Sequence, residues 1–192
     1  MRVRLRLSRR NYVRSPVYLP LAELERECRF ETLRRSGPGG QNRNKVETGV
    51  RFYHLSTGLV GEATESRRQI ENRGAALERL RLLLALNLRN PPDFSEPFEL
   101  GAARATLLEL GFRWHSRLAG ERIIASSESL DYAVLVAEFF DVYGAVDEEL
   151  GVAAEILAVS SSQIVRLLSK RPQALEALNS LRAKRGLRRL RP

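Results

Sequence analysis

The sequence contains few of the residues from which disulfides, metal centres and membrane spans are built. Of its 192 residues one is a cysteine, Cys28, and two are histidines, His54 and His115. A single cysteine excludes an internal disulfide, and so few cysteine and histidine ligands speak against a zinc site. The longest apolar runs, such as residues 82–86, fall far short of the roughly 20 residues that span a bilayer. We therefore expect a protein of a reducing, cytoplasmic compartment that binds no metal, no cofactor and no membrane.

Acidic residues are in the minority, and they gather in one part of the chain. There are 32 Lys and Arg against 23 Asp and Glu, a net charge of +9. Residues 1–90 carry +10, residues 91–150 carry −8, and residues 151–192 carry +7. Since 43% of the residues are hydrophobic, the chain is no disordered basic tail, and its charge favours a polyanionic partner. Residues 1–14 hold six Arg and no acid, which fits a surface arm or, alternatively, an organellar targeting segment.

The first half alternates short strand patterns with two helical ones. Residues 1–7 alternate Arg with Val or Leu, as an edge strand does, and residues 21–27 predict a short helix after Pro20. Strands are expected at residues 28–34, 50–54 and 59–62, the last two joined by a turn at residues 56–58. Ser66 can cap a helix running to about residue 86, with an apolar stripe of Ile70, Leu77, Leu80 and Leu84. Strands covered by a helix predict a small α+β domain.

Two consecutive prolines, Pro91 and Pro92, predict a domain boundary, and the rest of the chain reads as mainly helical. An amphipathic helix is expected over residues 130–143, ended by Gly144, and three more over 148–158, 160–170 and 172–184. Residues 122–126 are expected to pair with 112–116 as a small hairpin. The segment 147–170 has the spacing of a helix-turn-helix, but its second helix is poor in side chains that read bases, so we expect no DNA partner.

Residues 36–41, Ser-Gly-Pro-Gly-Gly-Gln, form the most informative stretch of the chain. Three glycines and a proline in six residues exclude regular structure and predict an exposed loop, flanked by basic residues. Backbone N–H groups of such a loop can approach an anion or a carbonyl closely. The spacing fits neither the Walker phosphate loop nor the dinucleotide-binding fingerprint.

The run SGPGGQNRNKVETGV at residues 36–50, with HLSTGL at 54–59, RRQ at 67–69 and NR at 72–73, resembles the catalytic domain of class I bacterial peptide chain release factors. The similarity covers about residues 28–86 without gaps. Ser56 and Arg68 stand where that family usually has Pro and Ser. The GGQ tripeptide of the family corresponds to Gly39, Gly40 and Gln41.

This resemblance implies hydrolysis of the ester bond between a nascent peptide and tRNA, inside the peptidyl transferase centre of the ribosome. Water is the nucleophile. On this reading the Gln41 backbone N–H stabilises the oxyanion or the departing ribose hydroxyl, and the Gln41 side chain positions the water. Gly39 and Gly40 would supply a backbone shape that a Cβ obstructs. No protein general base is needed, in agreement with the absence of a Ser-His-Asp pattern.

The resemblance also suggests an organisation and a set of RNA contacts. We expect a basic arm and short helix at residues 1–27, the catalytic domain at 28–90, a helical domain at 91–181 and a basic tail at 182–192. No decoding domain fits beside them, so the chain looks like the short release factor-like proteins that rescue stalled ribosomes without reading a stop codon. We expect a monomer whose RNA-contacting residues are Arg35, Arg43, Lys45, Arg67, Arg73, Arg182, Lys184, Arg185, Arg188 and Arg189.

Two other functions stay open on the sequence alone. The chain could be a non-catalytic factor that keeps the release factor fold to bind ribosomal RNA, although a pure binder has no need for Gly39, Gly40 and Gln41 together. A DNA-binding regulator built on the helical half is a third reading, and it leaves residues 28–86 unexplained. The tail could likewise sense an empty mRNA channel, or be only a solvated helix end.

Overall fold

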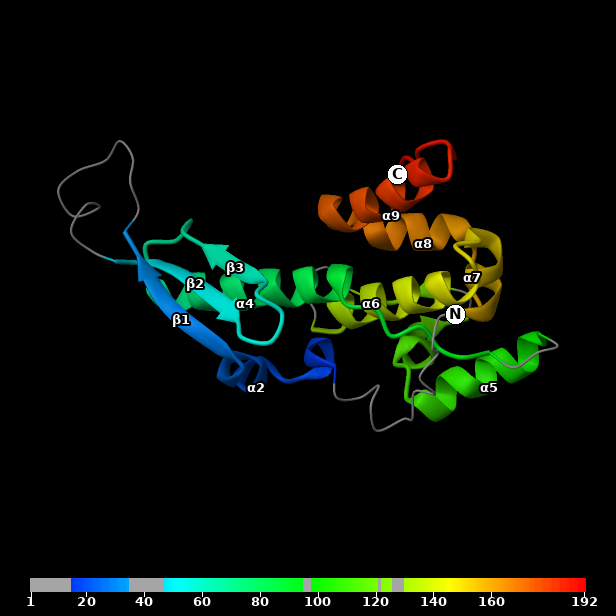
Figure 1. The fold of residues 1–192 in the computed structure, drawn as a ribbon, viewed down its shortest axis with the longest axis horizontal. Helices are drawn as coiled ribbons and strands as arrows, with labels where there is room; N and C mark the ends of the chain where they lie inside the picture. The colour runs from blue at the N-terminus through cyan, green and yellow to red at the C-terminus, as the bar shows by residue number, and fades with distance from the viewer. Residues whose placement is uncertain (1–14, 35–46, 95–97, 121, 126–129) are drawn as a thin grey trace. The chain divides into compact units, whose positions relative to one another are not determined.

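The computed structural model describes residues 15–34, 47–94, 98–120, 122–125 and 130–192 (Figure 1). The chain divides into two compact units. We call Pro16–Asn87 the N-terminal unit and Leu88–Pro192 the C-terminal unit. The first is α+β and the second mainly helical, as the sequence predicted. The edge strand expected at residues 1–7 lies outside the described residues.

A three-stranded antiparallel sheet forms the centre of the N-terminal unit. Its strands are β1 (Cys28–Leu33), β2 (Gly49–His54) and β3 (Val60–Ala63), in the order β1-β2-β3. The three predicted strands and the turn between the last two are confirmed. Side chains of β2 alternate in burial because every second residue faces the core, where Val50 and Phe52 are fully buried.

The long helix α4 (Gln69–Asn87) covers the core face of this sheet, behind β2 and β3 in Figure 1. Its buried stripe includes Leu77, Leu80 and Leu84, as expected, but Ile70 is 71% exposed, so that part of the prediction is wrong. At 100° per residue Ile70 lies about 200° around the helix from Asn72, which is the residue that faces inward at this end.

Helix α4 approaches β3 closely at one glycine. A Cβ added to Gly61 would lie 2.2 Å from the Ala76 carbonyl oxygen and 2.6 Å from the Leu80 Cβ. Only a residue without a side chain fits between the strand and the helix there. Gly61 therefore fixes the distance at which α4 packs on the sheet.

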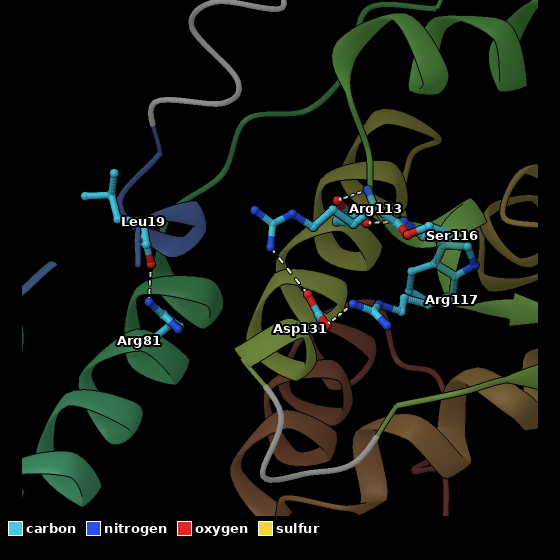
Figure 2. A network of polar contacts seen from close by, with 8 residues as sticks. Leu19, Arg81, Arg113, Ser116, Arg117 and Asp131 are labelled. Carbon is cyan, nitrogen blue, oxygen red and sulfur yellow. Dashed lines mark hydrogen bonds and ion pairs between the residues drawn. The ribbon is translucent and has the colours of Figure 1, made fainter. Parts of the chain in front are cut away.

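The chain enters this unit through a 3-10 turn, η1 (Pro16–Tyr18), and helix α2 (Leu21–Arg26), which confirms the predicted short helix. Val17 and Leu24 are buried and so extend the core beyond the sheet. The buried Arg81 of α4 donates a hydrogen bond to the Leu19 carbonyl (Figure 2). This bond connects the entering segment to α4.

The core of the C-terminal unit is built around α6 (Leu130–Ala145). Every residue from 132 to 143 is buried, so the helix is enclosed on all sides rather than amphipathic as expected, and it continues past Gly144 by one residue. The remaining helices are α5 (Leu100–Leu110), α7 (Leu150–Ile156), α8 (Ser161–Ser169) and α9 (Pro172–Lys184). The Tyr132 hydroxyl, 3.4 Å from the Leu168 carbonyl oxygen, links α6 to α8.

The buried carboxylate of Glu138 organises the turn that precedes α6. It accepts the backbone N–H groups of Arg113 and Trp114 at 2.6 and 2.9 Å. These two N–H groups are therefore not available for hydrogen bonds between strands, and residues 114–117 form a 3-10 turn instead. The predicted pairing of 112–116 with 122–126 is wrong in register, since β4 (Leu118–Ala119) pairs with β5 (Arg122–Ile123). Figure 2 shows Asp131 between the guanidinium groups of Arg113 and Arg117.

Helices α7 and α8 meet at an angle of 94°, with Ser160 as the N-cap of α8. The Ser160 hydroxyl accepts the Gln163 backbone N–H at 3.3 Å. The helices expected over 160–170 and 172–184 are confirmed, and the one expected over 148–158 is shorter, at residues 150–156. Within the described ranges no single helix is long and apolar enough to cross a membrane, although α7 and α8 taken together across their bend reach the required length and composition.

Candidate functional site

The glycine-rich segment connects two paired strands of the N-terminal unit. Strands β1 and β2 are antiparallel neighbours, and the last residue of β1, Leu33, pairs with the first residue of β2, Gly49. The connection between them holds Gly39, Gly40 and Gln41 together with Arg35, Arg43 and Lys45. All six lie outside the described residues, so the structure shows the base of the connection and not the tripeptide itself.

The Glu47 carboxylate fastens the two strands of this base to each other. Its Oε2 accepts the Thr32 hydroxyl at 2.7 Å, and its Oε1 accepts the Arg34 Nε–H at 2.9 Å. The hydrogen bonds from Thr32 and then Arg34 lower the pKa of Glu47 below its usual 4.5. The carboxylate is therefore ionised at neutral pH and bridges the chain entering the loop and the chain leaving it.

The first turns of α4 hold the same base from the other side. The Gln69 side-chain amide donates to the Glu47 carbonyl at 3.2 Å. Asn72 donates to the Thr48 carbonyl at 2.6 Å and to the Ser66 carbonyl at 2.9 Å, and its Oδ1 accepts the Ser66 N–H at 2.9 Å. Asn72 is only 1% exposed. We call Glu47, Gln69 and Asn72 the loop anchors.

The sequence analysis missed the loop anchors, although one signal pointed to them. Asn72 begins a four-residue spacing that continues through Ala76, Leu80 and Leu84, all of them buried. An amide side chain on a buried helix face must find internal partners, because a polar group without a hydrogen bond is costly there. Glu47 carries no such signal, since its partners Thr32 and Arg34 are brought to it only by strand pairing.

Two of the residues predicted to contact RNA, Arg67 and Arg73, lie near this base and differ in whether they form an ion pair. Arg67 is exposed just before α4 begins. Arg73 is also exposed, but its guanidinium forms an ion pair with Glu25 and lies 5.3 Å from the centre of the Phe30 ring. The structure thus shows Arg67 exposed to solvent and the Arg73 guanidinium paired with Glu25.

The predicted basic residues at the C-terminal end lie in the other unit, and most of them contact their own chain. Arg182, Arg185 and Arg189 donate to carbonyl or carboxylate oxygens of residues 147–149, 176 and 188. Lys184 and Arg188 are exposed. Arg185 and Arg189 are also exposed, so what distinguishes them from Lys184 and Arg188 is their ion pairs and not their burial.

A histidine with hydroxyl and carboxylate neighbours is present, but its geometry is structural. His54 lies with its Nδ1 2.8 Å from the Thr57 hydroxyl and its Nε2 3.1 Å from Glu27. The ring is fully buried and the Thr57 hydroxyl also accepts the Leu59 N–H, so the group stabilises the turn between β2 and β3. In the part of the chain that the structure describes, no cluster of His, Cys, Asp or Glu could hold a metal ion.

Comparison with known proteins matches the N-terminal unit to one family. Residues 22–96 match the RF-1 domain. The chain is 36% identical over 146 residues to peptide chain release factor 1 of Leptothrix cholodnii, covering 71% of this chain and 39% of that protein. It is 38% identical over 69 residues, 36% of this chain and 18% of the relative, to the mitochondrial peptide chain release factor 1-like protein of Rattus norvegicus.

A similar match is found with peptide chain release factor 2 of Thermomicrobium roseum, at 46% identity over 66 residues, which cover 34% of this chain and 18% of that protein. The chain thus spans less than two fifths of the length of each of these relatives. No solved structure matches it.

Proposed function

Because residues 22–96 match the RF-1 domain, we propose that this chain is a class I peptide chain release factor that hydrolyses the ester bond of peptidyl-tRNA on the ribosome. Gly39, Gly40 and Gln41 are the proposed catalytic residues. The observation that carries the proposal is the fastened base of their connection, in which Thr32 of β1, Arg34 and the first turn of α4 hold Glu47 and Thr48.

The chemistry follows from what such a loop can offer. A backbone N–H held in place stabilises the charge that develops on the carbonyl or the ribose oxygen, and it needs no reorganisation during the reaction. An attacking water would be positioned by the Gln41 side chain. The anchors supply the fixed base that this arrangement requires, since a loop displaced by about 1 Å can lose a factor of about 100 in rate.

We further propose that release does not depend on a stop codon and that the protein rescues stalled ribosomes. The support is the C-terminal unit, which is mainly helical and carries a basic segment at residues 182–191. Ribosomal RNA and peptidyl-tRNA are the proposed partners. Arg67, whose side chain faces solvent near α4, is the proposed phosphate contact in the described part of the N-terminal unit.

The test uses purified ribosomes that carry formyl-methionyl-tRNA in the P site. The mRNA ends at the P-site codon, or extends beyond it with a sense or a stop codon in the A site, and released formyl-methionine is measured. We expect release without a stop codon, and near-complete loss on Gly40→Ala with unchanged ribosome binding. Gly74→Ala, at a helical glycine with open space around it, is the matched control.

The outcomes separate the proposals. Equal release by the wild type and Gly40→Ala would remove the catalytic assignment of Gly40, whereas release no higher than in the absence of the protein would leave a factor that binds ribosomal RNA. Release confined to ribosomes with a stop codon would keep hydrolysis and reject the rescue role.

A further inference from the structure

The last residues of the chain fold back on α9. The helix ends at Lys184, and Gly186 adopts a left-handed conformation with φ of +70°. The Leu187 N–H then donates to the Arg182 carbonyl at 3.0 Å, a bond typical of a helix that ends in a reversal. Residues 187–192 therefore run back beside the helix they follow.

A buried side chain holds this segment by its backbone. Asn179 is 4% exposed; its Nδ2 donates to the Leu190 carbonyl at 3.1 Å and its Oδ1 accepts the Leu190 N–H at 2.8 Å. The Arg182 guanidinium donates to the Arg188 carbonyl from Nε and Nη2, at 3.1 and 3.0 Å. A solvated helix end would make no such paired contacts.

Two arginines of this segment form ion pairs with carboxylates. Both terminal nitrogens of Arg189 contact the Glu176 carboxylate, and Arg185 donates to Glu149 at 3.1 Å and to the Asp147 carbonyl. A carboxylate presents two oxygens to a guanidinium in the same way as a phosphodiester does. These glutamates therefore occupy the positions that RNA phosphates would take.

The charge distribution singles out one of these partners. Residues 151–192 contain nine basic and only two acidic residues, Glu155 and Glu176. One of the two is the partner of Arg189. Ion pairs exposed to solvent contribute little free energy, so a polyanion can displace these carboxylates.

We propose that residues 182–191 form an RNA-binding segment that is held in a closed form by Glu149, Glu176 and Asn179, which we call the latch, and that RNA phosphates compete with the two glutamates for Arg185 and Arg189. The inference rests on the proposed function only in taking ribosomal RNA as the partner. In the closed form Lys184 and Arg188 are exposed and are paired with neither glutamate, so they make the first contact with RNA. When the segment opens, Arg185 and Arg189 also contact the RNA.

The first test measures binding of the full chain to a fluorescently labelled 12-nucleotide oligouridylate by anisotropy. Glu149→Gln/Glu176→Gln removes both competing charges and keeps the side-chain shape. Glu109→Gln/Glu155→Gln, at exposed positions of the same unit, changes the net charge by the same amount. We expect the latch variant to bind about fivefold more tightly than the control at low salt, with the difference shrinking as salt rises. Equal affinities of the two variants would overturn the proposal.

The second test opens the segment without changing the charge. Asn179→Ala is expected to raise the rate of trypsin cleavage after residues 185, 188 and 189 about tenfold and to tighten RNA binding, whereas Ser180→Ala, at the exposed neighbour, changes neither. Faster cleavage with unchanged RNA affinity would show that the fold-back does not restrain RNA binding, and unchanged cleavage would show that Asn179 does not hold the segment. Neither assay contains a ribosome, so failure of peptide release leaves this result standing.

Discussion

Replacing Asn72 by alanine should loosen the base of the glycine-rich connection more than any exposed change nearby. The substitution removes two hydrogen bonds to carbonyl oxygens, of Thr48 and Ser66, and one from the Ser66 N–H. These backbone groups lie where the chain leaves the loop and where it enters α4. These Thr48 and Ser66 backbone groups still require hydrogen-bond partners when the Asn72 amide is removed.

The magnitude follows from these contacts. A hydrogen bond contributes about 1 kcal/mol net, and a buried group left without its partner costs more. Three bonds at a side chain that is 1% exposed therefore give about 3 kcal/mol for the N-terminal unit. Asn87→Ala is the matched control on the same helix, since the exposed Asn87 amide makes one bond, to the Leu83 carbonyl, and should cost about 0.5 kcal/mol or less.

The assay can separate the two units because the single tryptophan, Trp114, lies in the C-terminal unit. Urea unfolding followed by Trp114 fluorescence should be unchanged in Asn72→Ala, while hydrogen exchange of peptides from β2 should show the loss of stability. In the release assay the variant should lose turnover at saturating ribosome concentration more than it loses affinity. A loss below about 0.5 kcal/mol, or a shift confined to the fluorescence transition, would refute the reasoning.

Further predictions concern the packing of α4, the cysteine and the loop base. Gly61→Ala in β3 should destabilise the N-terminal unit by about 1–3 kcal/mol, measured by hydrogen exchange of β2 peptides, because the added methyl group meets the backbone of α4, whereas Gly74→Ala, in open space on α4, should stabilise it by about 0.5–1 kcal/mol. Partial burial, then the charges of Glu27 and Glu25, raises the pKa of Cys28 to about 11, so alkylation at pH 8 should be about 100-fold slower than that of a thiol with the ordinary pKa of 9.0. A rate like that of free cysteine would contradict the half-buried position of the thiol. The pKa of Glu47 is held below 4.5, so the stability that its carboxylate gives to the loop base is complete above that pH and is lost as the pH falls through the lowered pKa. A carboxyl NMR titration should show the pKa of Glu47 rising towards 4.5 in Arg34→Ala, and no rise would reject the contact between the two side chains.

Local patterns predicted the elements of the N-terminal unit well. The strands near residues 28, 50 and 60 were set by alternation, and the turn before β3 by Ser, Thr and Gly at residues 56–58. The position of α4 against the sheet was not predictable in this way, because Gly61 acts through Ala76 and Leu80, which are remote in sequence. The Ile70 error has the same origin: periodicity gives a stripe, and the neighbouring sheet decides which end of it is covered.

In the C-terminal unit the helices were predicted and their surroundings were not. Glu138 lies within the helix expected to be amphipathic, but it is buried and its carboxylate accepts the backbone N–H groups of Arg113 and Trp114, where the hairpin was expected. The basic tail shows the same limit. Its composition allowed a channel-sensing tail or a solvated helix end, and the contacts of the segment with Asn179 and Glu176 could not be read from the sequence.

The N-terminal unit is one unbroken stretch of sequence, Pro16–Asn87, and this has a consequence for how the protein is made. All partners of the loop anchors lie between residues 32 and 72, so the fastened base can form as soon as α4 has left the exit tunnel of the translating ribosome. Helix α6, by contrast, packs against α7, and its Tyr132 hydroxyl lies near the Leu168 carbonyl of α8; both of these helices are synthesised later. Folding during synthesis should therefore complete the loop base before the helical unit has acquired its core.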